Sequence, residues 1–231
     1  MKKSLVATLT AGFALLIGAN SASAAVLYNG LSIPSQTPAQ QRWLYLSSFV
    51  IPVPSAIATN QGTILDSSGT NANYAGYFRP SPMILDRSKG YTVTFKVQIN
   101  SESHSSMNRA GFSIIVISNK LASEPQPYGL ELGFWENSIW AQNVGFTRGE
   151  NVSYNTKALA QTYKLSIKDG KYQLFVNGIT TPILTGNLRQ YTGFTPPAGY
   201  PNPYTMPNLV FLGDDTTSAK AKVTIVSVEV N

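Results

Sequence analysis

The apolar residues of this chain alternate with a period of two, and this period decides the fold class. In YTVTFKVQIN, from Tyr91 to Asn100, every second residue is apolar and those between are polar. Such alternation is typical of a β-strand with one buried face. No segment holds a helical period over three turns, since TKALAQ from Thr156 to Gln161 would form little more than one turn. The sequence therefore predicts an all-β protein, a two-sheet antiparallel β-sandwich.

Further strands follow from the same pattern. Residues Tyr163–Lys168 and Tyr172–Val176 alternate on either side of Asp169-Gly170, a pair that favours a tight turn, so they predict a hairpin. The run FSIIVI, Phe112–Ile117, is apolar almost throughout and predicts a central strand covered on both faces. Residues Val223–Val230 predict the last strand.

Two segments depart from the strand pattern and are predicted to be long loops. The first is Ser32–Gly69, which contains four prolines, at positions 34, 38, 52 and 54. The second is YTGFTPPAGYPNPYTMPN, Tyr191–Asn208. Long ordered loops on a β scaffold often carry binding elements, but an exposed excursion without a role is an equal alternative.

The first 24 residues have the pattern of an export signal. Lys2 and Lys3 precede an apolar run, Leu5–Ala19, and the small residues Ala22-Ser23-Ala24 predict cleavage after Ala24. The run is shorter than the ~20 residues that a membrane-spanning helix needs, and no later segment comes closer. We expect residues 25–231 to form one β-sandwich domain, secreted or periplasmic, with no membrane span and no disulfides, since the chain lacks cysteine.

The net charge and the small number of metal-ligating residues limit the classes of partner and metal that this chain can bind. The formal net charge is +6, but the basic residues are spread singly, which argues against nucleic acid and leaves an acidic polysaccharide or an ordinary mixed surface. The single histidine, His104, lies in a serine-rich segment and is expected to be a solvated loop residue. Zinc would lack ligands. Calcium stays open at Asp214 and Asp215, with a turn that caps the last strand as the alternative.

The segment GLELGFWENSIWAQN, from Gly129 to Asn143, predicts a hairpin with its turn at Asn137-Ser138. That turn would place Trp135 opposite Trp140, Gly133 opposite Gln142 and Glu131 opposite Val144, all on one face. The other face would be core, with Leu132, Phe134, Ile139 and Ala141.

On the first face, the two indoles, Gln142 and Glu131 would border a gap in front of Gly133. Such a trough suits a sugar ring, because an indole covers its C–H face while amide and carboxylate groups bind its hydroxyls. The equal alternative is a Trp–Trp pair that only stabilises the hairpin, by about 0.2 to 1 kcal/mol. Three further residues are expected to be second-tier contacts or ordinary loop anchors: Arg109, Arg189 and Tyr191.

The two glutamates of this segment also suggest a catalytic pair. Glu131 and Glu136 are five residues apart, so a regular strand would place them on opposite faces. A bulge at Gly133 would bring them to one face, where they could flank a glycosidic bond.

These residues resemble the concanavalin A-like lectins and glucanases, a jelly-roll superfamily. Its laminarinase-like hydrolases carry E-x-D-x-x-E on a bulged strand, with the first Glu as nucleophile and the last as acid/base. Glu131 and Glu136 match that spacing, but Gly133 replaces the Asp. The resemblance implies a concanavalin A-like jelly roll, and it implies a hydrolase only if the pair can work without the Asp.

A wider resemblance covers four segments: NRAGFSIIVIS, GLELGFWENSIWAQN, LRQYTGF and PNLVFLGDDTTSAKAKVTIVSVEV. They look like exported bacterial choice-of-anchor domains, which have no established catalytic residues. The chain departs from anchored members because it ends on a predicted strand at Asn231, which leads us to expect release or periplasmic residence. The first hypothesis is therefore a non-catalytic protein that binds a polysaccharide or cell-surface glycan. The alternatives are a polysaccharide hydrolase or lyase on the same fold, and an envelope or matrix structural protein.

Overall fold

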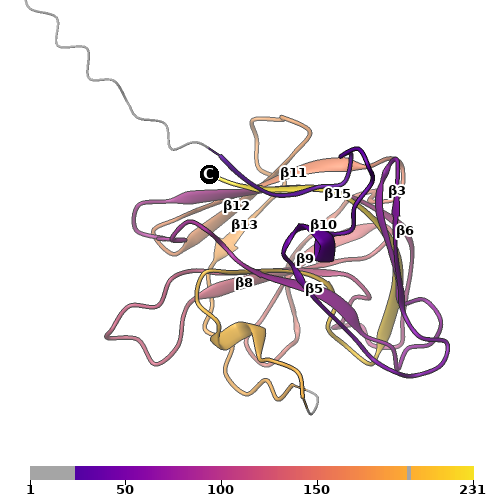
Figure 1. Cartoon of the computed structure of the whole chain (residues 1–231). Helices are drawn as coiled ribbons and strands as arrows, with labels where there is room; N and C mark the ends of the chain where they lie inside the picture. The colour runs from indigo at the N-terminus through magenta and orange to yellow at the C-terminus, as the bar shows by residue number, and fades with distance from the viewer. Residues whose placement is uncertain (1–23, 197–198) are drawn as a thin grey trace, which may run out of the picture.

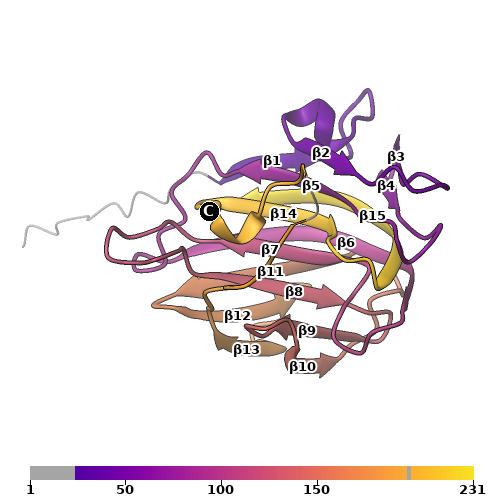
Figure 2. The same cartoon turned by 90° about the horizontal axis from the view of Figure 1, so that it is seen from below.

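A computed structural model describes residues 24–196 and 199–231, which form two antiparallel β-sheets packed face to face (Figures 1 and 2). The predicted export signal lies outside the described residues, apart from Ala24. Among the described residues, no helix is long and apolar enough to cross a membrane. The predicted two-sheet antiparallel sandwich is confirmed.

Sheet A runs in the order β13-β12-β11-β6-β15-β4-β3, and β1 pairs with β15 beside this path. Its strands are β1 (Ala25–Asn29), β3 (Ser55–Thr59), β4 (Gly62–Asp66), β6 (Tyr91–His104), β11 (Gln161–Lys168), β12 (Lys171–Val176), β13 (Leu184–Asn187) and β15 (Ala219–Val230). The predicted strand at 91–100 and the predicted hairpin, β11 and β12, are both present in this sheet.

Sheet B runs in the order β10-β9-β8-β7-β14-β5-β2. Its strands are β2 (Leu44–Ser47), β5 (Ala75–Pro80), β7 (Ser113–Ile117), β8 (Gly129–Phe134), β9 (Ser138–Gln142), β10 (Arg148–Ser153) and β14 (Leu209–Asp214). Two short 3-10 helices complete the described elements, η1 (Pro38–Gln41) and η2 (Pro203–Thr205).

The main core fills the space between the two sheets. Alternate residues of β6, among them Phe95, point inward and meet Phe134 of β8 and Tyr163 of β11. The rings of Phe95 and Tyr163 stack with their centroids 5.3 Å apart. The central strand β7 is buried at every residue, as its nearly continuous apolar run predicts. Burial of these aromatic and branched side chains is the main force holding the sandwich together.

The prediction of a long loop at Ser32–Gly69 is wrong. This segment contains η1 and the strands β2, β3 and β4. Each strand has only four or five residues, and prolines interrupt the chain between β2 and β3. Runs this short do not show a clear alternation, so the prolines dominate the pattern.

The β8–β9 hairpin has the predicted faces but not the predicted register. Gly133 lies opposite Trp140, and Leu132 lies opposite Ala141. The backbone N–H of Trp135 donates to the carbonyl of Ser138, which places the turn at Glu136-Asn137. Because the shift is two positions, each side chain keeps its face, and the prediction of the core face is confirmed.

The face of sheet B that points away from sheet A is covered by a third layer, the segment of residues 191–196 and 199–208, hereafter the covering loop. Figure 1 shows it, with η2, on the side of sheet B remote from sheet A. Its Tyr191 and Tyr204 pack with Phe211 and Ile115 of the sheet in a second apolar cluster. The outer face of this sheet is therefore largely closed to water.

We predict that Gly133→Ala lowers the free energy of unfolding by about 1–3 kcal/mol, because it overpacks the contact with Trp140. A methyl group at this position would lie 2.6 Å from the Trp140 ring. In a Trp140→Leu background the loss should be smaller, since the ring is gone. Urea unfolding of the four proteins measures this coupling. An equal loss in both backgrounds would contradict the proposed contact.

Candidate functional site

Glu131 is the centre of a buried polar cluster on the outer face of sheet B. Its side chain projects from β8 beneath the covering loop, and the residue is 2% exposed. Ser113 of β7 donates to Glu131 Oε1 over 3.1 Å, and the hydroxyl of Tyr204 donates to Oε2 over 2.6 Å. Since Tyr204 belongs to η2, this short hydrogen bond ties the covering loop to the sheet.

A second carboxylate and a guanidinium complete the cluster. The Tyr204 hydroxyl lies 3.2 Å from Asp215 Oδ2, and Arg109 Nη2 lies 3.4 Å from the same oxygen. The Arg109 guanidinium also lies over the ring of Phe146, 5.2 Å from its centroid. One cation thus faces two carboxylates in a place closed to water.

The charges of this cluster influence one another. Burial, and secondly the negative charge of Asp215, raise the pKa of Glu131 to about 7, against an opposing effect of Arg109. Burial also raises the pKa of Tyr204 far above 10, so this hydroxyl stays protonated and is the donor in its hydrogen bond to Glu131. Glu131 therefore holds a proton more readily than an exposed glutamate does.

The hydroxyl group of Tyr191 lies between β8 and β9 and bonds the backbone of both strands. It accepts a hydrogen bond from the backbone N–H of Glu131 over 3.0 Å and donates to the carbonyl of Gln142 over 2.8 Å. Arg189 forms an ion pair with Glu150 of β10, and its backbone pairs with Gly129 at both N–H and C=O. The sequence left Arg189 and Tyr191 as either second-tier ligand contacts or loop anchors. These hydrogen bonds and the ion pair favour the role of loop anchors.

The prediction of an open tryptophan trough is wrong. Trp135 and Trp140 are 6% and 0% exposed. The imidazole of His104 stacks on Trp135, with centroids 3.8 Å apart and an interplanar angle of 2°, and Arg148 lies over the same ring at 4.8 Å. Sequence patterning identified the shared face correctly but did not reveal these covering side chains.

Gln142 is likewise buried, at 1% exposed, and its backbone carbonyl accepts a hydrogen bond from the Tyr191 hydroxyl. Arg109 contacts the indole through its backbone, because Trp135 Nε1 donates to the Arg109 carbonyl over 2.9 Å. The predicted sugar contacts are thus assembled on one face but lie beneath other residues. Their observed role is packing.

The prediction that His104 is a solvated loop residue is also wrong. β6 extends as far as His104, and Nδ1 lies 3.0 Å from the carboxylate of Glu102, two residues earlier on the same face. The strand continues through a polar serine-rich stretch because β15 pairs with it along this length. Tertiary pairing overrides the weak local propensity.

The predicted glutamate pair does not form. The pairing of β7 with β8 is regular through Gly133, so no bulge turns Glu136 towards Glu131. Glu136 lies in the hairpin turn, where its carboxylate accepts from the backbone N–H of Glu102 and pairs with Lys157 at 3.0 Å. The partner carboxylate of Glu131 is Asp215, which is distant in the sequence.

The adjacent carboxylates Asp214 and Asp215 point to opposite faces of sheet B. Asp214 is buried towards sheet A, where Ser67 donates to it over 2.7 Å and the backbone N–H of Thr216 donates over 3.1 Å. Within the ranges that the structure describes, no three His, Asp or Glu side chains are grouped so that they could hold a metal ion. The turn alternative describes the contacts of Asp214, and calcium at this pair stays a prediction.

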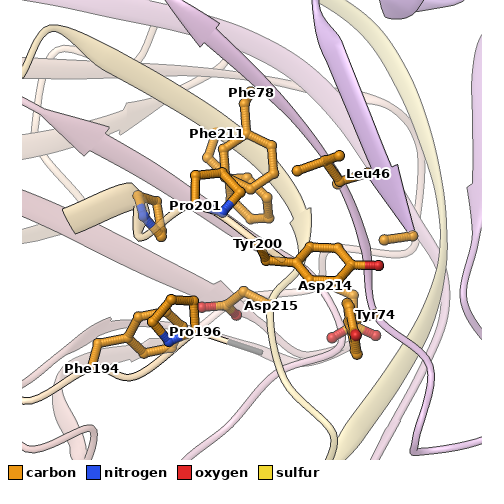
Figure 3. A pocket seen from close by; sticks show the side chains of 13 residues that line it. Leu46, Tyr74, Phe78, Phe194, Pro196, Tyr200, Pro201, Phe211, Asp214 and Asp215 are labelled. Carbon is orange, nitrogen blue, oxygen red and sulfur yellow. The ribbon is translucent and has the colours of Figure 1, made fainter. Parts of the chain in front are cut away.

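A pocket opens at one margin of the covering loop, where the loop meets β2, β5 and β14; we call it the loop-edge pocket. Its cavity volume is about 40 Å³, and its lining includes Leu46, Phe78, Phe194, Pro196, Tyr200 and Asp215 (Figure 3). The rings of Tyr74 and Tyr200 meet edge to face on one side, with centroids 4.8 Å apart.

Two acidic residues line the loop-edge pocket, Asp214 and Asp215, and Asp215 has an oxygen without a partner in the part of the chain that the structure describes. Figure 3 shows its carboxylate beside Tyr200 and Pro196. Its side chain is 7% exposed, and Oδ1 has no hydrogen-bond partner among the described residues. A buried carboxylate oxygen without a donor is uncommon, and this one leaves a hydrogen-bond acceptor beside the loop-edge pocket. Sequence patterning missed Tyr74 and Tyr200, although the aromatic and proline content of Tyr191–Asn208 pointed to this loop.

Comparisons with known proteins agree on the fold. No family model matches the chain, and no curated protein matches it. A carbohydrate esterase from the Shiga toxin-encoding bacteriophage phi24B superposes with a TM-score of 0.57 at 10% identity, over 90% of this chain and 98% of that one. A Bacillus subtilis protein of unknown function with a galectin-like fold gives 0.54 at 12% identity, over 90% and 96%.

A sialidase also matches, with a TM-score of 0.50 at 13% identity, over 84% of this chain but only 17% of the sialidase. At these identities the likeness concerns the fold alone. The protein is a β-sandwich of the concanavalin A-like jelly-roll class, as the sequence predicted.

We predict that Glu131 makes stability depend on pH. Its pKa is about 7 in the folded protein against the usual 4.5, so the folded state binds the proton more tightly. Its stabilising contribution is complete below pH 4.5 and is lost as pH rises through 7, by an amount on the order of 3 kcal/mol. Urea unfolding of the native protein and of Glu131→Gln from pH 4 to 9 measures the difference. Two parallel curves would contradict the assignment.

Proposed function

We propose that this protein is an exported, non-catalytic carbohydrate-binding jelly-roll domain that holds its ligand in the loop-edge pocket. The observation that carries the proposal is the unpartnered Asp215 Oδ1 at the base of aromatic and proline walls. A sugar ring can lay its C–H face on an aromatic ring such as Tyr200 while one hydroxyl donates to the carboxylate. This arrangement has the chemistry first expected of the tryptophan face, at a different place on the same sheet.

The fold supports a carbohydrate ligand by analogy. The phage protein of similar fold is a carbohydrate esterase, and another match is a sialidase. Fold analogy favours the ligand class and does not identify the sugar. Export, with secretion or periplasmic residence, and a relation to choice-of-anchor domains belong to the same proposal and rest on the sequence patterns at residues 1–24 and in the second half of the chain.

Binding is favoured over hydrolysis by the state of the carboxylates. Glu131 is sealed beneath the covering loop, and Asp215 Oδ2 already faces Arg109 and Tyr204. A glycosidase needs two carboxyl groups that both reach the scissile bond. Asp214 also lines the loop-edge pocket, but its two carboxylate oxygens accept hydrogen bonds from Ser67 and from the backbone N–H of Thr216, so Asp215 Oδ1 is the acidic oxygen left to recognise a hydroxyl.

We predict that Tyr200→Ala weakens retention on the bound polysaccharide by about tenfold, the loss of one aromatic face. Tyr200→Phe keeps the ring and should bind nearly as the native protein does. Trp135→Phe should also leave retention unchanged, because that ring lies outside the loop-edge pocket. Affinity electrophoresis across neutral and acidic polysaccharides measures all three, with thermal unfolding as the check on folding.

Two outcomes would overturn the proposal. One is the absence of retention on every polysaccharide tested. The other is release of reducing ends that Asp215→Asn abolishes, which would assign the loop-edge pocket to a hydrolase. Loss of binding by Trp135→Phe with Tyr200→Ala unaffected would return the site to the tryptophan face.

A further inference from the structure

One edge of the sandwich is formed by a stretch of the chain without charged residues. Residues 43–65 contain no Asp, Glu, Lys or Arg, although 12% of the whole chain is charged. This stretch includes β2, the outermost strand of sheet B, and β3, the outermost strand of sheet A. Figure 2 shows β2 and β3 at the same edge of the sandwich, joined by the segment of residues 48–54.

Large apolar side chains along this edge face water. The set consists of Leu44 (54% exposed), Phe49 (89%), Val50 (41%), Ile51 (85%), Val53 (51%) and Ile57 (58%), and we call it the apolar edge. Single exposed apolar residues are ordinary, but six within fourteen positions without an intervening charge favour an interaction surface.

The opposite edge of the sandwich is closed by its own residues. There β10 carries Arg148 and Glu150, and Glu150 forms an ion pair with Arg189 next to β13. Its carboxylate lies so close to Gly186 of β13 that a methyl group on that glycine would meet Oε1 at 2.6 Å. Charge and packing thus protect one pair of edge strands, whereas the apolar edge has no such protection.

β3 offers its backbone as well as its side chains. Ala56 packs inward on the core, while Ile57, the middle residue of the strand, points outward. Beyond the ladder with β4, no backbone group of residues 55–59 has a hydrogen-bond partner within residues 24–196 and 199–231. Unpaired N–H and C=O groups on an uncharged edge favour the addition of another strand.

We propose that the apolar edge binds a second copy of this chain, with the two β3 strands antiparallel across a two-fold axis. In such a contact the same residues from both subunits meet near the axis, so any charge there would face its own copy. The lack of charge at 43–65 removes that repulsion, and Ile57 would meet Ile57 of the partner subunit. A lipid surface fits less well, because lipid tails cannot satisfy the free backbone groups of β3.

Sedimentation velocity of the protein obtained from the full chain, over a range of concentrations, tests the proposal. We expect a reversible dimer. Ile57→Lys and Ile57→Glu should each weaken it at least about tenfold by placing like charges at the axis. An equimolar mixture of the two variants should restore a dimer, since opposite charges then meet. Ile179→Lys is the matched control, because Ile179 is 54% exposed on a turn remote from this edge.

A native protein that stays monomeric up to about 100 μM, a concentration at which even a weak specific dimer is populated, would overturn the proposal. So would a dimer that Ile57→Lys leaves intact, or one that the mixture of charge variants does not restore. A monomer that sediments with phosphatidylcholine vesicles would assign the apolar edge to lipid instead. The result is independent of carbohydrate binding, because Ile57 does not line the loop-edge pocket.

Discussion

The hydrogen bond from Tyr204 to Glu131 fixes the third layer of this protein. It joins η2 in the covering loop to β8 in the centre of sheet B over 2.6 Å, and the same hydroxyl lies 3.2 Å from Asp215. A buried carboxylate without such a donor would cost several kcal/mol, about the stability of a small domain. The position of the covering loop, and hence of the loop-edge pocket, depends on this contact.

The outer face of sheet B is built to be covered. Gly133 leaves room for the Trp140 ring, and Gly76 leaves room for Phe211. At Glu131 and Gln142, β8 and β9 do not pair with each other. The hydroxyl of Tyr191, in the covering loop, bonds the backbone of both residues instead. The proposed ligand site therefore lies at the margin of this face. Asp215 belongs both to the buried polar cluster and to the loop-edge pocket. Its Oδ2 contacts Arg109, while its Oδ1 has no hydrogen-bond partner among the described residues.

Local patterns predicted the sheets well, because alternation at β6, β11 and β12 directly reports a buried face. They also predicted which residues of the β8–β9 hairpin share a face, although the turn lies one position earlier than expected and the register of β9 is shifted by two. They failed where distant segments meet. His104 lies over Trp135, 31 positions later, and Tyr204 contacts Glu131, 73 positions earlier, and no local period encodes such contacts. The short strands β2 to β4 were not predicted, because each is too short to show a clear alternation and prolines lie between β2 and β3.

The burial of the indoles distinguishes a covered sheet face from an open sugar trough, and tryptophan fluorescence reports it directly. The chain has three tryptophans, and Trp43, Trp135 and Trp140 are 3%, 6% and 0% exposed. Acrylamide quenching of the native protein should therefore be weak for all of the emission and should rise strongly only on unfolding in urea. Strong quenching of most of the emission in the folded protein would show that Trp135 and Trp140 face water, and would contradict the covering of this sheet face by His104 and Arg148.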